Sequence, residues 1–587
     1  MSGLVAFTGP PDRDLALRMM QQLSHRGGLV DHVVETPAGT ILAVEWSTRD
    51  DAFHNAGRVA EPSQRTHLGL VRSGIYRTEH CVWALSGFAW SALPNLATPQ
   101  SLRGLRGSFA VACLSDNQLA IARDAVGCQS LYYGRAGSRW LVATEPKAIT
   151  SEASFAKRLR PSAIAQYLAF SFVPGSGTML ENLYEAEAGH LVHLCNGDEP
   201  RVERYFQFED DEYSPEQDDA DDDKWILQTR QCLEQAVAER LTHSEAAIFL
   251  SGGLDSSIVA AEVARQSSRP VRTFSIHFGT KYPNELSFAR AVAERIGSRH
   301  EEVLIEPKRF LPRLRQMVWH LDEPIGDPIT QPNFELAAHV SASHDCVWNG
   351  EGGDPLFGGP KNLPMMLLHW YGDAERPINF REQAYLASYR RAYEEWTRLL
   401  SNDLKQHIDP TRDLEQILQP FFSSVRPRSF LNKLMAINIR LKGANLILPK
   451  VDRMLAAHRL TPLSPLFDDQ LTRLSFRMPP TMKLRHGIEK YVLKRAYEND
   501  LPREVIERPK SGMRVPVHYW FRKELRRYAA SILSKRDIQQ AGIFNHERVA
   551  QLLRYETEEG PGRYGLRLWM LLTFEIWRRI VVEGEAV

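Results

Sequence analysis

One stretch near the middle of the chain constrains its fold more than any other. Residues 246–250 (AAIFL) are an apolar run typical of a buried strand, residues 251–257 (SGGLDSS) are a turn of glycine and serine, and residues 258–266 follow as a helical run. Because Gly252 and Gly253 lack Cβ atoms, backbone N–H groups can converge there on an anion, which the helix N-terminus also attracts. The lysine of a Walker A loop is absent. The stretch therefore predicts a phosphate-binding loop of another kind.

Side chains of the same turn add to this chemistry. The hydroxyls of Ser251, Ser256 and Ser257 are further donors toward phosphate oxygens, and the carboxylate of Asp255 can hold a metal ion against the phosphates. The motif SGGLDS is similar to the pyrophosphate loop of N-type ATP pyrophosphatases, which cleave ATP between its α and β phosphates. A plain serine- and glycine-rich connection between strand and helix is the alternative. We expect an adenylating enzyme.

Composition limits the domain number and the partners. A length of 587 residues is too great for one hydrophobic core, so we expect two or three domains. Lys and Arg total 72, as do Asp and Glu, so no net basic charge attracts nucleic acid or an anionic membrane. The six cysteines stand singly, which indicates neither a zinc site nor a disulfide framework. With no signal peptide and no apolar run of about 18 residues, we expect a cytoplasmic protein that binds neither nucleic acid nor a membrane.

The chain divides into two halves of different pattern. Residues 1–207 are rich in short apolar runs between turn residues, which predicts a sheet-dominated α+β domain of two layered sheets. Residues 208–224 are strongly acidic and predict a solvated linker. Within residues 225–587, strands alternate with helices before a long helical region, the pattern of an α/β domain with a doubly wound parallel sheet. Its ligand should lie at the carboxyl ends of the strands.

Seven further stretches carry a family resemblance. They are, in order, residues 1–7 (MSGLVAF), 24–28 (SHRGG), 123–133 (RDAVGCQSLYY), 144–148 (TEPKA), 349–359 (NGEGGDPLFGG), 448–454 (LPKVDRM) and 508–516 (RPKSGMRVP). Together they resemble the motifs of the asparagine synthetase B family, which includes β-lactam synthetases and lasso-peptide cyclases. The resemblance implies a degenerate glutamine amidotransferase type 2-like domain, an Ntn-hydrolase-like αββα sandwich, followed by an N-type ATP pyrophosphatase domain with a helical C-terminal part.

The resemblance also implies a site for ATP, Mg²⁺ and a carboxylate substrate. The residues that would hold ATP are Leu250, Ser251, Gly252, Gly253, Leu254, Asp255, Ser256, Ser257, Ile276, Asn349 and Gly350. Asp255 and Asp354 would hold Mg²⁺. Lys510 would be the catalytic cation over the acyl-adenylate, and Glu351 would position the substrate or take a proton from the attacking amine.

Two of these residues have a second interpretation, and three further polar residues also resemble family positions. Lys510 could be an exposed surface lysine, and Glu351 could be a loop carboxylate paired with a nearby arginine. Glu323 and Asp327 fit a polar loop near the phosphates. Lys490, in the run GIEKYVLKRA, is interpreted as a structural lysine of a helix, so we leave it outside the predicted site.

The N-terminal half departs from the family pattern where glutamine would be hydrolysed. Ser2 stands where glutamine-hydrolysing members carry cysteine, and a hydroxyl is a far weaker nucleophile than a thiol. The loop that would hold glutamine reads RSGIYR at residues 72–77, without the Asn and Glu of the family's NGEIYN. Residues 39–50 (GTILAVEWSTRD) have no counterpart of the arginine that the family carries in a GHRRL-like stretch. We therefore predict that glutaminase activity is lost and that the domain is kept for structure.

The sequence of the predicted acyl pocket also departs from the family pattern. Thr461 and Leu463 replace a Glu and an Arg that are thought to shape the family's amino-acid pocket. A pocket without that arginine lacks a bidentate partner for a carboxylate, which indicates a larger or less charged substrate than aspartate.

We therefore expect an ATP- and Mg²⁺-dependent amide ligase of natural-product biosynthesis that forms AMP and pyrophosphate. A lasso-type macrolactam cyclase and an intermolecular amide synthase are the leading versions, followed by a β-lactam synthetase and an ammonia-dependent asparagine synthetase. A catalytically silent scaffold and a tRNA-modifying or sulfur-transferring enzyme are the other classes considered. The expected partners are a small-molecule or peptide carboxylate and an amine. A protein that delivers a peptide or carrier-bound substrate, and a homodimer, are compatible with the sequence.

Overall fold

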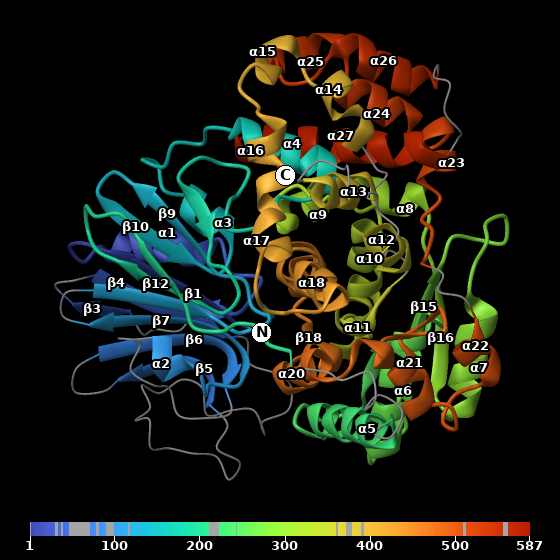
Figure 1. Cartoon of the computed structure of the whole chain (residues 1–587). Helices are drawn as coiled ribbons and strands as arrows, with labels where there is room; N and C mark the ends of the chain where they lie inside the picture. Colours follow the sequence, from blue (N-terminus) through green and yellow to red (C-terminus); the bar gives the residue numbers. More distant parts are fainter. Residues whose placement is uncertain are drawn as a thin grey trace. The chain divides into compact units, whose positions relative to one another are not determined.

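The computed structural model of the chain (Figure 1) forms two compact units, each assembled from separate segments. The N-terminal unit comprises Met1–Leu159, Gly175–Gln207 and Gly443–Thr461, and the C-terminal unit comprises Arg160–Pro174, Phe208–Lys442 and Pro462–Val587. The structure describes residues 2–29, 33–36, 39–45, 71–77, 81–89, 99–115, 118–210, 222–241, 244–359, 362–370, 379–388, 393–508, 512–555 and 562–587.

Two antiparallel sheets form the N-terminal unit, as the short apolar runs predicted. The first has the order β11 (Leu183–Glu185), β9 (Tyr132–Ala136), β10 (Arg139–Ala143), β1 (Ser2–Thr8), β4 (Gly39–Glu45) and β2 (Gly28–Leu29), with β3 (Val34–Thr36) beside β4. The second has the order β13 (Arg201–Arg204), β12 (His190–Leu194), β8 (Gln118–Arg123), β7 (Gly107–Ser115), β6 (Cys81–Ala89) and β5 (Val71–Arg77).

The two sheets share one hydrophobic core. Leu4 and Ala6 of β1 belong to the same buried cluster as Ala110 and Ala112 of β7, so alternate residues of both sheets face inward. Helices α1 (Arg13–Gln21) and α3 (Pro146–Thr150) pack on the first sheet.

A parallel sheet organises the C-terminal unit. Its order is β16 (Arg299–Leu304), β15 (Arg272–His277), β14 (Ala247–Phe249), β17 (Cys346–Trp348) and β18 (Thr461–Leu463). Strands β16, β15, β14 and β17 run parallel, and helices α6 (Leu254–Gln266), α7 (Leu286–Arg295) and α10 (Thr330–Val340) connect them. The sequence predicted these four strands, but it missed β18, because a three-residue strand that contains a proline shows no alternation.

Helix α4 (Pro161–Phe170) comes from the N-terminal half of the sequence but packs within the C-terminal unit. The hydroxyl of the fully buried Tyr167 donates to the carbonyl oxygen of Met570 at 2.8 Å, and Gln166 Nε2 donates to the carbonyl of Asp413 at 3.0 Å. At the end of the helix, the carbonyl of Ser171 accepts from the N–H of Gly326 at 2.8 Å. A domain boundary at residues 208–224 assigns α4 to the N-terminal domain, whereas the helix packs in the C-terminal unit.

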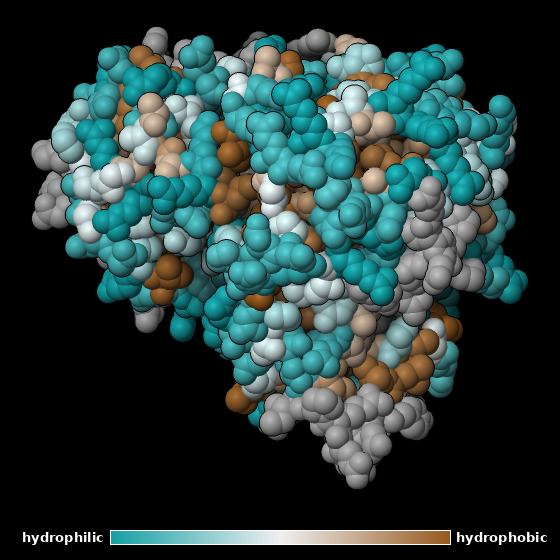
Figure 2. All heavy atoms as spheres, turned by 90° about the horizontal axis from the view of Figure 1, so that it is seen from above, coloured by the Kyte–Doolittle hydropathy of each residue, from teal (hydrophilic) through white to brown (hydrophobic). Residues whose placement is uncertain are grey.

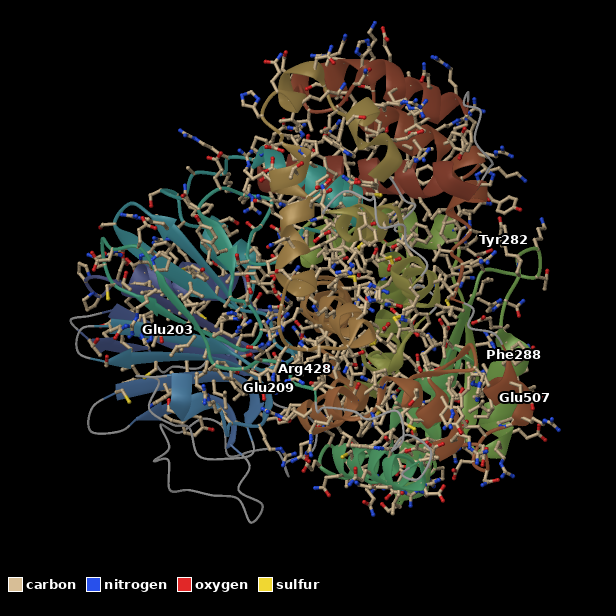
Figure 3. All side chains as sticks on the ribbon, in the orientation of Figure 1. Glu203, Glu209, Tyr282, Phe288, Arg428 and Glu507 are labelled. Carbon is tan, nitrogen blue, oxygen red and sulfur yellow. The ribbon has the colours of Figure 1, made fainter. Side chains whose placement is uncertain are left out.

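The acidic stretch is anchored at both ends. Phe208 stacks on Phe476 with ring centroids 4.4 Å apart, and the buried Asp210 accepts from the N–H groups of Arg428 at 2.9 Å and Ser429 at 3.0 Å (Figure 3 labels Arg428). Helix α5 (Asp222–Ala238) begins at the other end. A solvated linker was predicted for the whole stretch, whereas Phe208 and Asp210 are buried, and backbone amides satisfy the Asp210 carboxylate. Residues 211–221 lie outside the described part.

Hydrophobic side chains are scattered on the face of the molecule shown in Figure 2. That face is mainly hydrophilic, and the hydrophobic residues on it occur in small separate groups. In the part of the chain that the structure describes, no helix is both long enough and apolar enough to cross a membrane.

Candidate active site

The predicted phosphate loop connects β14 to α6, as the sequence indicated. The N–H of Leu250 donates to the carbonyl of Phe274 at 2.9 Å and so continues the pairing with β15. Gly252 has φ +76°, and a Cβ there would lie 2.7 Å from the backbone nitrogen of Ala289, so a side chain does not fit. Gly253 begins α6 without a side-chain cap. No capping side chain therefore blocks the N-terminus of α6, whose dipole favours an anion.

The serine hydroxyls of the loop bond within the loop. Ser251 Oγ lies 2.9 Å from Ser256 Oγ and accepts from the N–H of Gly253 at 3.2 Å. Ser257 Oγ donates to the carbonyl of Gly253 at 2.8 Å. The sequence suggested donors toward phosphate, whereas in this structure the hydroxyls hold the shape of the loop.

Two neighbouring strand ends approach the loop. Ile276 is buried at the end of β15, and Asn349 and Gly350 follow β17. A Cβ on Gly350 would lie 2.4 Å from the backbone nitrogen of Ser256, so this segment lies directly against the first turn of α6. The structure thus brings the predicted ATP-binding residues to one edge of the sheet, as expected for a parallel sheet.

The segment that carries Glu351 is fastened to β18. Asn349 donates through its N–H to the carbonyl of Leu463 at 3.0 Å. Its Oδ1 accepts from Ser464 Oγ at 3.0 Å and from the N–H of Glu351 at 3.1 Å. The half-buried Glu351 is thus joined through Asn349 to Leu463, one of the two residues that replace the family's Glu and Arg.

Asp255 and Asp354 lie on separate elements and share one cation. Asp255 is in the first turn of α6, and Asp354 is in α11 (Gly353–Phe357). Lys490 Nζ lies 2.5 Å from Asp255 Oδ2 and 2.5 Å from Asp354 Oδ1, and its side chain is only 4 % exposed. Lys490 was interpreted from the sequence as a structural helix lysine outside the site, whereas in the structure it precedes a helix and its ammonium contacts both carboxylates. The resemblance of this position to the family pattern was the available signal for a role in the site. The contact with Asp255 could not be inferred, because the two residues are 235 positions apart.

The carboxylate pair is a suitable donor set for Mg²⁺. Mg²⁺ prefers oxygen ligands and is usually held by one or two carboxylates together with phosphate oxygens. A Cβ on Gly353 would lie 2.2 Å from Asp255 Oδ1, so glycine is what allows the Asp255 carboxylate to approach α11. Among the described residues, no group of three or more His, Cys, Asp or Glu could hold a metal.

Lys510 lies outside the described residues. Arg508, two positions before it, contacts the phosphate loop. Arg508 Nη1 donates to the carbonyl of Gly252 at 3.2 Å, Nη2 is ion-paired with Glu285, and the guanidinium lies 4.2 Å from the ring centroid of Phe288 (labelled in Figure 3). Arg508 thus fastens the start of the predicted catalytic segment to the phosphate loop.

Replacing Arg508 by alanine is expected to weaken binding of Mg·ATP about 10- to 100-fold, because the loss of a charge-assisted bond and a cation–π contact costs about 1.5–3 kcal/mol. Affinity is measured by titration with a fluorescent ATP analogue. Arg503→Ala is the matched control: its side chain is 86 % exposed and is ion-paired with Glu507 on the same helix, α22 (Arg503–Glu507). Equal effects of the two substitutions would contradict the prediction.

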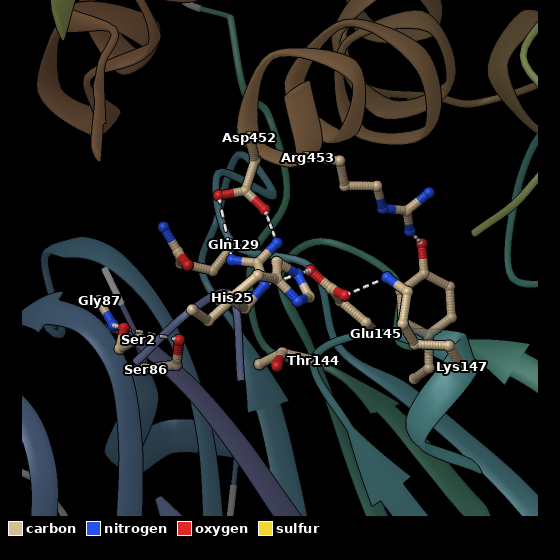
Figure 4. Close-up of polar contacts among 12 residues, drawn as sticks. Ser2, His25, Ser86, Gly87, Gln129, Thr144, Glu145, Lys147, Asp452 and Arg453 are labelled. Atoms are coloured by element: carbon tan, nitrogen blue, oxygen red, sulfur yellow. Dashed lines mark hydrogen bonds and ion pairs between the residues drawn. The ribbon is translucent and has the colours of Figure 1, made fainter. Parts of the chain in front are cut away.

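In the N-terminal unit, Ser2 lies in a closed group of small polar residues (Figure 4). Its buried Oγ accepts from the N–H of Gly87 at 3.0 Å and lies 3.0 Å from Ser86 Oγ. Ser73, in β5, bonds the same Gly87, with Oγ 2.9 Å from its nitrogen. Residues 72–77, which stand where the family has its glutamine-binding loop, lie in this strand, while residues 46–50 of the other departing stretch lie outside the described part.

Beside Ser2, three of the resembling stretches (residues 24–28, 144–148 and 448–454) meet around Glu145 (Figure 4). Glu145 is fully buried and is ion-paired with Arg26, His25 and Lys147. Arg26 is also paired with Asp452, from the segment 443–461 that belongs to this unit. Although burial opposes ionisation, these cations hold the pKa of Glu145 well below its usual range. The sequence did not predict this cluster, because its members are distant along the chain.

Comparison with known proteins agrees with this architecture. Amidotransferase-type antiparallel sheets followed by a parallel sheet with a pyrophosphatase loop define a glutamine amidotransferase-type domain joined to an N-type ATP pyrophosphatase domain. The family model described as Asparagine synthase matches residues 228–579, and the one described as Glutamine amidotransferase domain matches residues 95–206. The chain belongs to the asparagine synthase family. It is an asparagine synthetase-like, ATP-dependent amide ligase.

Individual relatives are distant. A putative glutamine-hydrolyzing asparagine synthetase of Mycobacterium tuberculosis is 27% identical over 100% of this chain and 98% of its own length. Asparagine synthetase [glutamine-hydrolyzing] 1 of Bacillus subtilis is 26% identical over 82% of this chain and 78% of its own. Amidase chry2 of Gibberella zeae is 24% identical over 75% and 74%.

Proposed function

We propose that this ligase uses ATP and Mg²⁺ to adenylate a carboxylate other than aspartate and joins the acyl group to an amine that does not come from glutamine. One observation carries the proposal: Asp255 and Asp354, on separate elements, meet at one cation beside the N-terminus of α6. That arrangement suits the phosphates of ATP and a divalent ion that neutralises the departing pyrophosphate.

The proposed reaction has two steps. A carboxylate oxygen of the substrate bonds to the α-phosphorus of ATP, while the bond from that phosphorus to the oxygen that bridges to the β-phosphate breaks and pyrophosphate leaves. The amine nitrogen then bonds to the acyl carbon, a proton passes from nitrogen to a base, and AMP leaves. We assign Glu351 as the base or positioning group and Lys510 as the cation that stabilises the developing negative charge.

The surroundings of Ser2 support an amine source other than glutamine. Its hydroxyl already accepts from the N–H of Gly87 and contacts Ser86 Oγ within a buried group. A buried hydroxyl with these bonds is a poor nucleophile, and the Asn and Glu of the family's glutamine loop are missing. The two relatives named as glutamine-hydrolyzing therefore differ, in this proposal, from the present chain.

The position of Leu463 supports a change of carboxylate substrate. Its carbonyl accepts from Asn349, in the same segment as Glu351, so the apolar residue lies beside the proposed acyl site. An arginine at this position would attract a second carboxylate, whereas leucine favours an uncharged or apolar group. We propose macrolactam formation within a peptide or amide formation between two molecules, both as steps of natural-product biosynthesis.

The test is release of pyrophosphate from Mg·ATP with a panel of amino acids, β-amino acids and peptides, with and without glutamine or ammonium. Release that requires one carboxylate and ignores glutamine is the expected result, and Asp354→Asn should abolish it. The product mass then separates the two versions: loss of one water from a single molecule indicates cyclisation, and the sum of two molecules minus water indicates intermolecular synthesis. Release stimulated by glutamine, with glutamate formed, would contradict the proposal.

A further inference from the structure

Lys490 is the most constrained charged residue of the site. Its Nζ contacts one oxygen of each carboxylate at 2.5 Å, and its side chain is 4 % exposed, while those of Asp255 and Asp354 are 10 % and 28 % exposed. Its backbone has φ +56°, in the left-handed region that is unfavourable for residues other than glycine. The surrounding structure therefore holds the ammonium between the carboxylates at some cost in backbone energy.

A bound divalent ion would compete directly with this ammonium. Mg²⁺ lies about 2.0–2.1 Å from its oxygen ligands, and Lys490 Nζ already occupies a position within 2.5 Å of Asp255 Oδ2 and Asp354 Oδ1. Two cations that close to the same oxygens would repel each other strongly in a largely buried site. The metal can therefore use these oxygens only if Lys490 moves away.

We infer that Lys490 is an internal counter-cation that keeps free divalent metal out of the Asp255–Asp354 pair until nucleotide arrives. In the absence of nucleotide, the ammonium neutralises the two carboxylates and holds α6 and α11 together. Nucleotide phosphates bring new negative charge to the loop and so offer the ammonium another partner, which lets Lys490 leave the two carboxylates to a metal ion. The enzyme consequently binds Mg²⁺ together with ATP rather than in advance. This inference rests on the proposed assignment of Asp255 and Asp354 as the metal-holding residues.

Direct metal binding to the full-length protein without nucleotide is the test. Mn²⁺ stands in for Mg²⁺, and free Mn²⁺ is counted by electron paramagnetic resonance. Lys490→Met is expected to bind one Mn²⁺ at least about tenfold more tightly than the unmodified protein, which corresponds to about 1.4 kcal/mol. Lys490→Arg keeps the charge and should bind Mn²⁺ as weakly as the unmodified protein.

Two further variants locate the effect. Lys494→Met removes a lysine of helix α21 (Tyr491–Ala496), which begins directly after Lys490, and should leave Mn²⁺ binding unchanged. Lys490→Met combined with Asp354→Asn should lose the gained site. Thermal unfolding provides a second readout: Mg²⁺ alone should raise the midpoint of Lys490→Met by several degrees but leave that of the unmodified protein unchanged. If Lys490→Met folds only when Mg²⁺ is present, the same conclusion follows.

Equal Mn²⁺ affinity of Lys490→Met and the unmodified protein would overturn the inference, as would a gain in Lys490→Arg equal to that in Lys490→Met. A gained site that survives Asp354→Asn would overturn the assignment of the metal-holding pair instead. Failure of the unmodified protein to release pyrophosphate with any carboxylate would count against the proposed function alone, because the metal titration uses neither ATP nor acyl substrate.

Discussion

A fragment of residues 222–587, which removes the whole N-terminal half, is expected not to fold. Residues 163–170 of α4 are all buried in the C-terminal unit, and Tyr167 bonds the backbone of Met570 there. Each large apolar side chain of α4 contributes about 1.5–3 kcal/mol through burial, so losing Ile164, Tyr167, Leu168 and Phe170 together removes an amount comparable with the whole stability of a typical domain, about 5–15 kcal/mol. Solubility and near-ultraviolet circular dichroism measure the outcome.

A split chain provides the control for this truncation. Residues 1–216 and 217–587, produced together as two polypeptides, should form a soluble complex, because the break lies in the acidic stretch and each piece still supplies its segment to the other compact unit. A native near-ultraviolet spectrum of the 222–587 fragment alone would show that α4 is dispensable. If the prediction holds, it explains why an amidotransferase-type half persists in a chain for which we propose no glutaminase activity.

The phosphate loop could be predicted from the sequence because its parts are contiguous. A strand, two glycines and a helix start lie within residues 246–266, and each follows from local chemistry. The parallel order of β14, β15, β16 and β17 followed from alternating strands and helices. The carboxyl-end rule then brought Ile276 and Asn349 to the same edge.

Features that depend on contacts between distant residues could not be predicted in this way. Lys490 is separated from Asp255 by 235 positions, and its helical surroundings favoured a structural interpretation. Asp452 lies 426 positions from Arg26, with which it is paired. Asp210 lies in an acidic run, for which composition predicts exposure to solvent. It is nevertheless buried, and the N–H groups of Arg428 and Ser429 donate to its carboxylate. In each case a partner that is distant in the sequence allows a charged side chain to be buried, and local sequence does not reveal that partner.

Gly353→Ala is expected to lower the rate of pyrophosphate release about 100-fold or more while leaving stability nearly unchanged. The new Cβ would lie 2.2 Å from Asp255 Oδ1 and 2.3 Å from its Cγ, so the carboxylate must move by about 1 Å, a displacement that typically costs about 100-fold in rate. The backbone of Gly353 lies outside the left-handed region, so alanine brings no strain of its own. Pyrophosphate release and thermal unfolding are measured on the same preparation.

Two other glycines separate the possible causes of such a loss. Gly104→Ala places a Cβ with nothing within 4 Å and should match the unmodified protein in both rate and stability. Gly350→Ala places its Cβ 2.4 Å from the backbone of Ser256, which cannot rotate away as a side chain can, so it should lose stability as well as rate. A Gly353→Ala enzyme with the normal rate would show that the position of the Asp255 carboxylate does not limit catalysis, and the proposed metal-holding role would then fail. A loss of rate at normal stability, found only at Gly353, would place the Asp255 carboxylate in the chemical step.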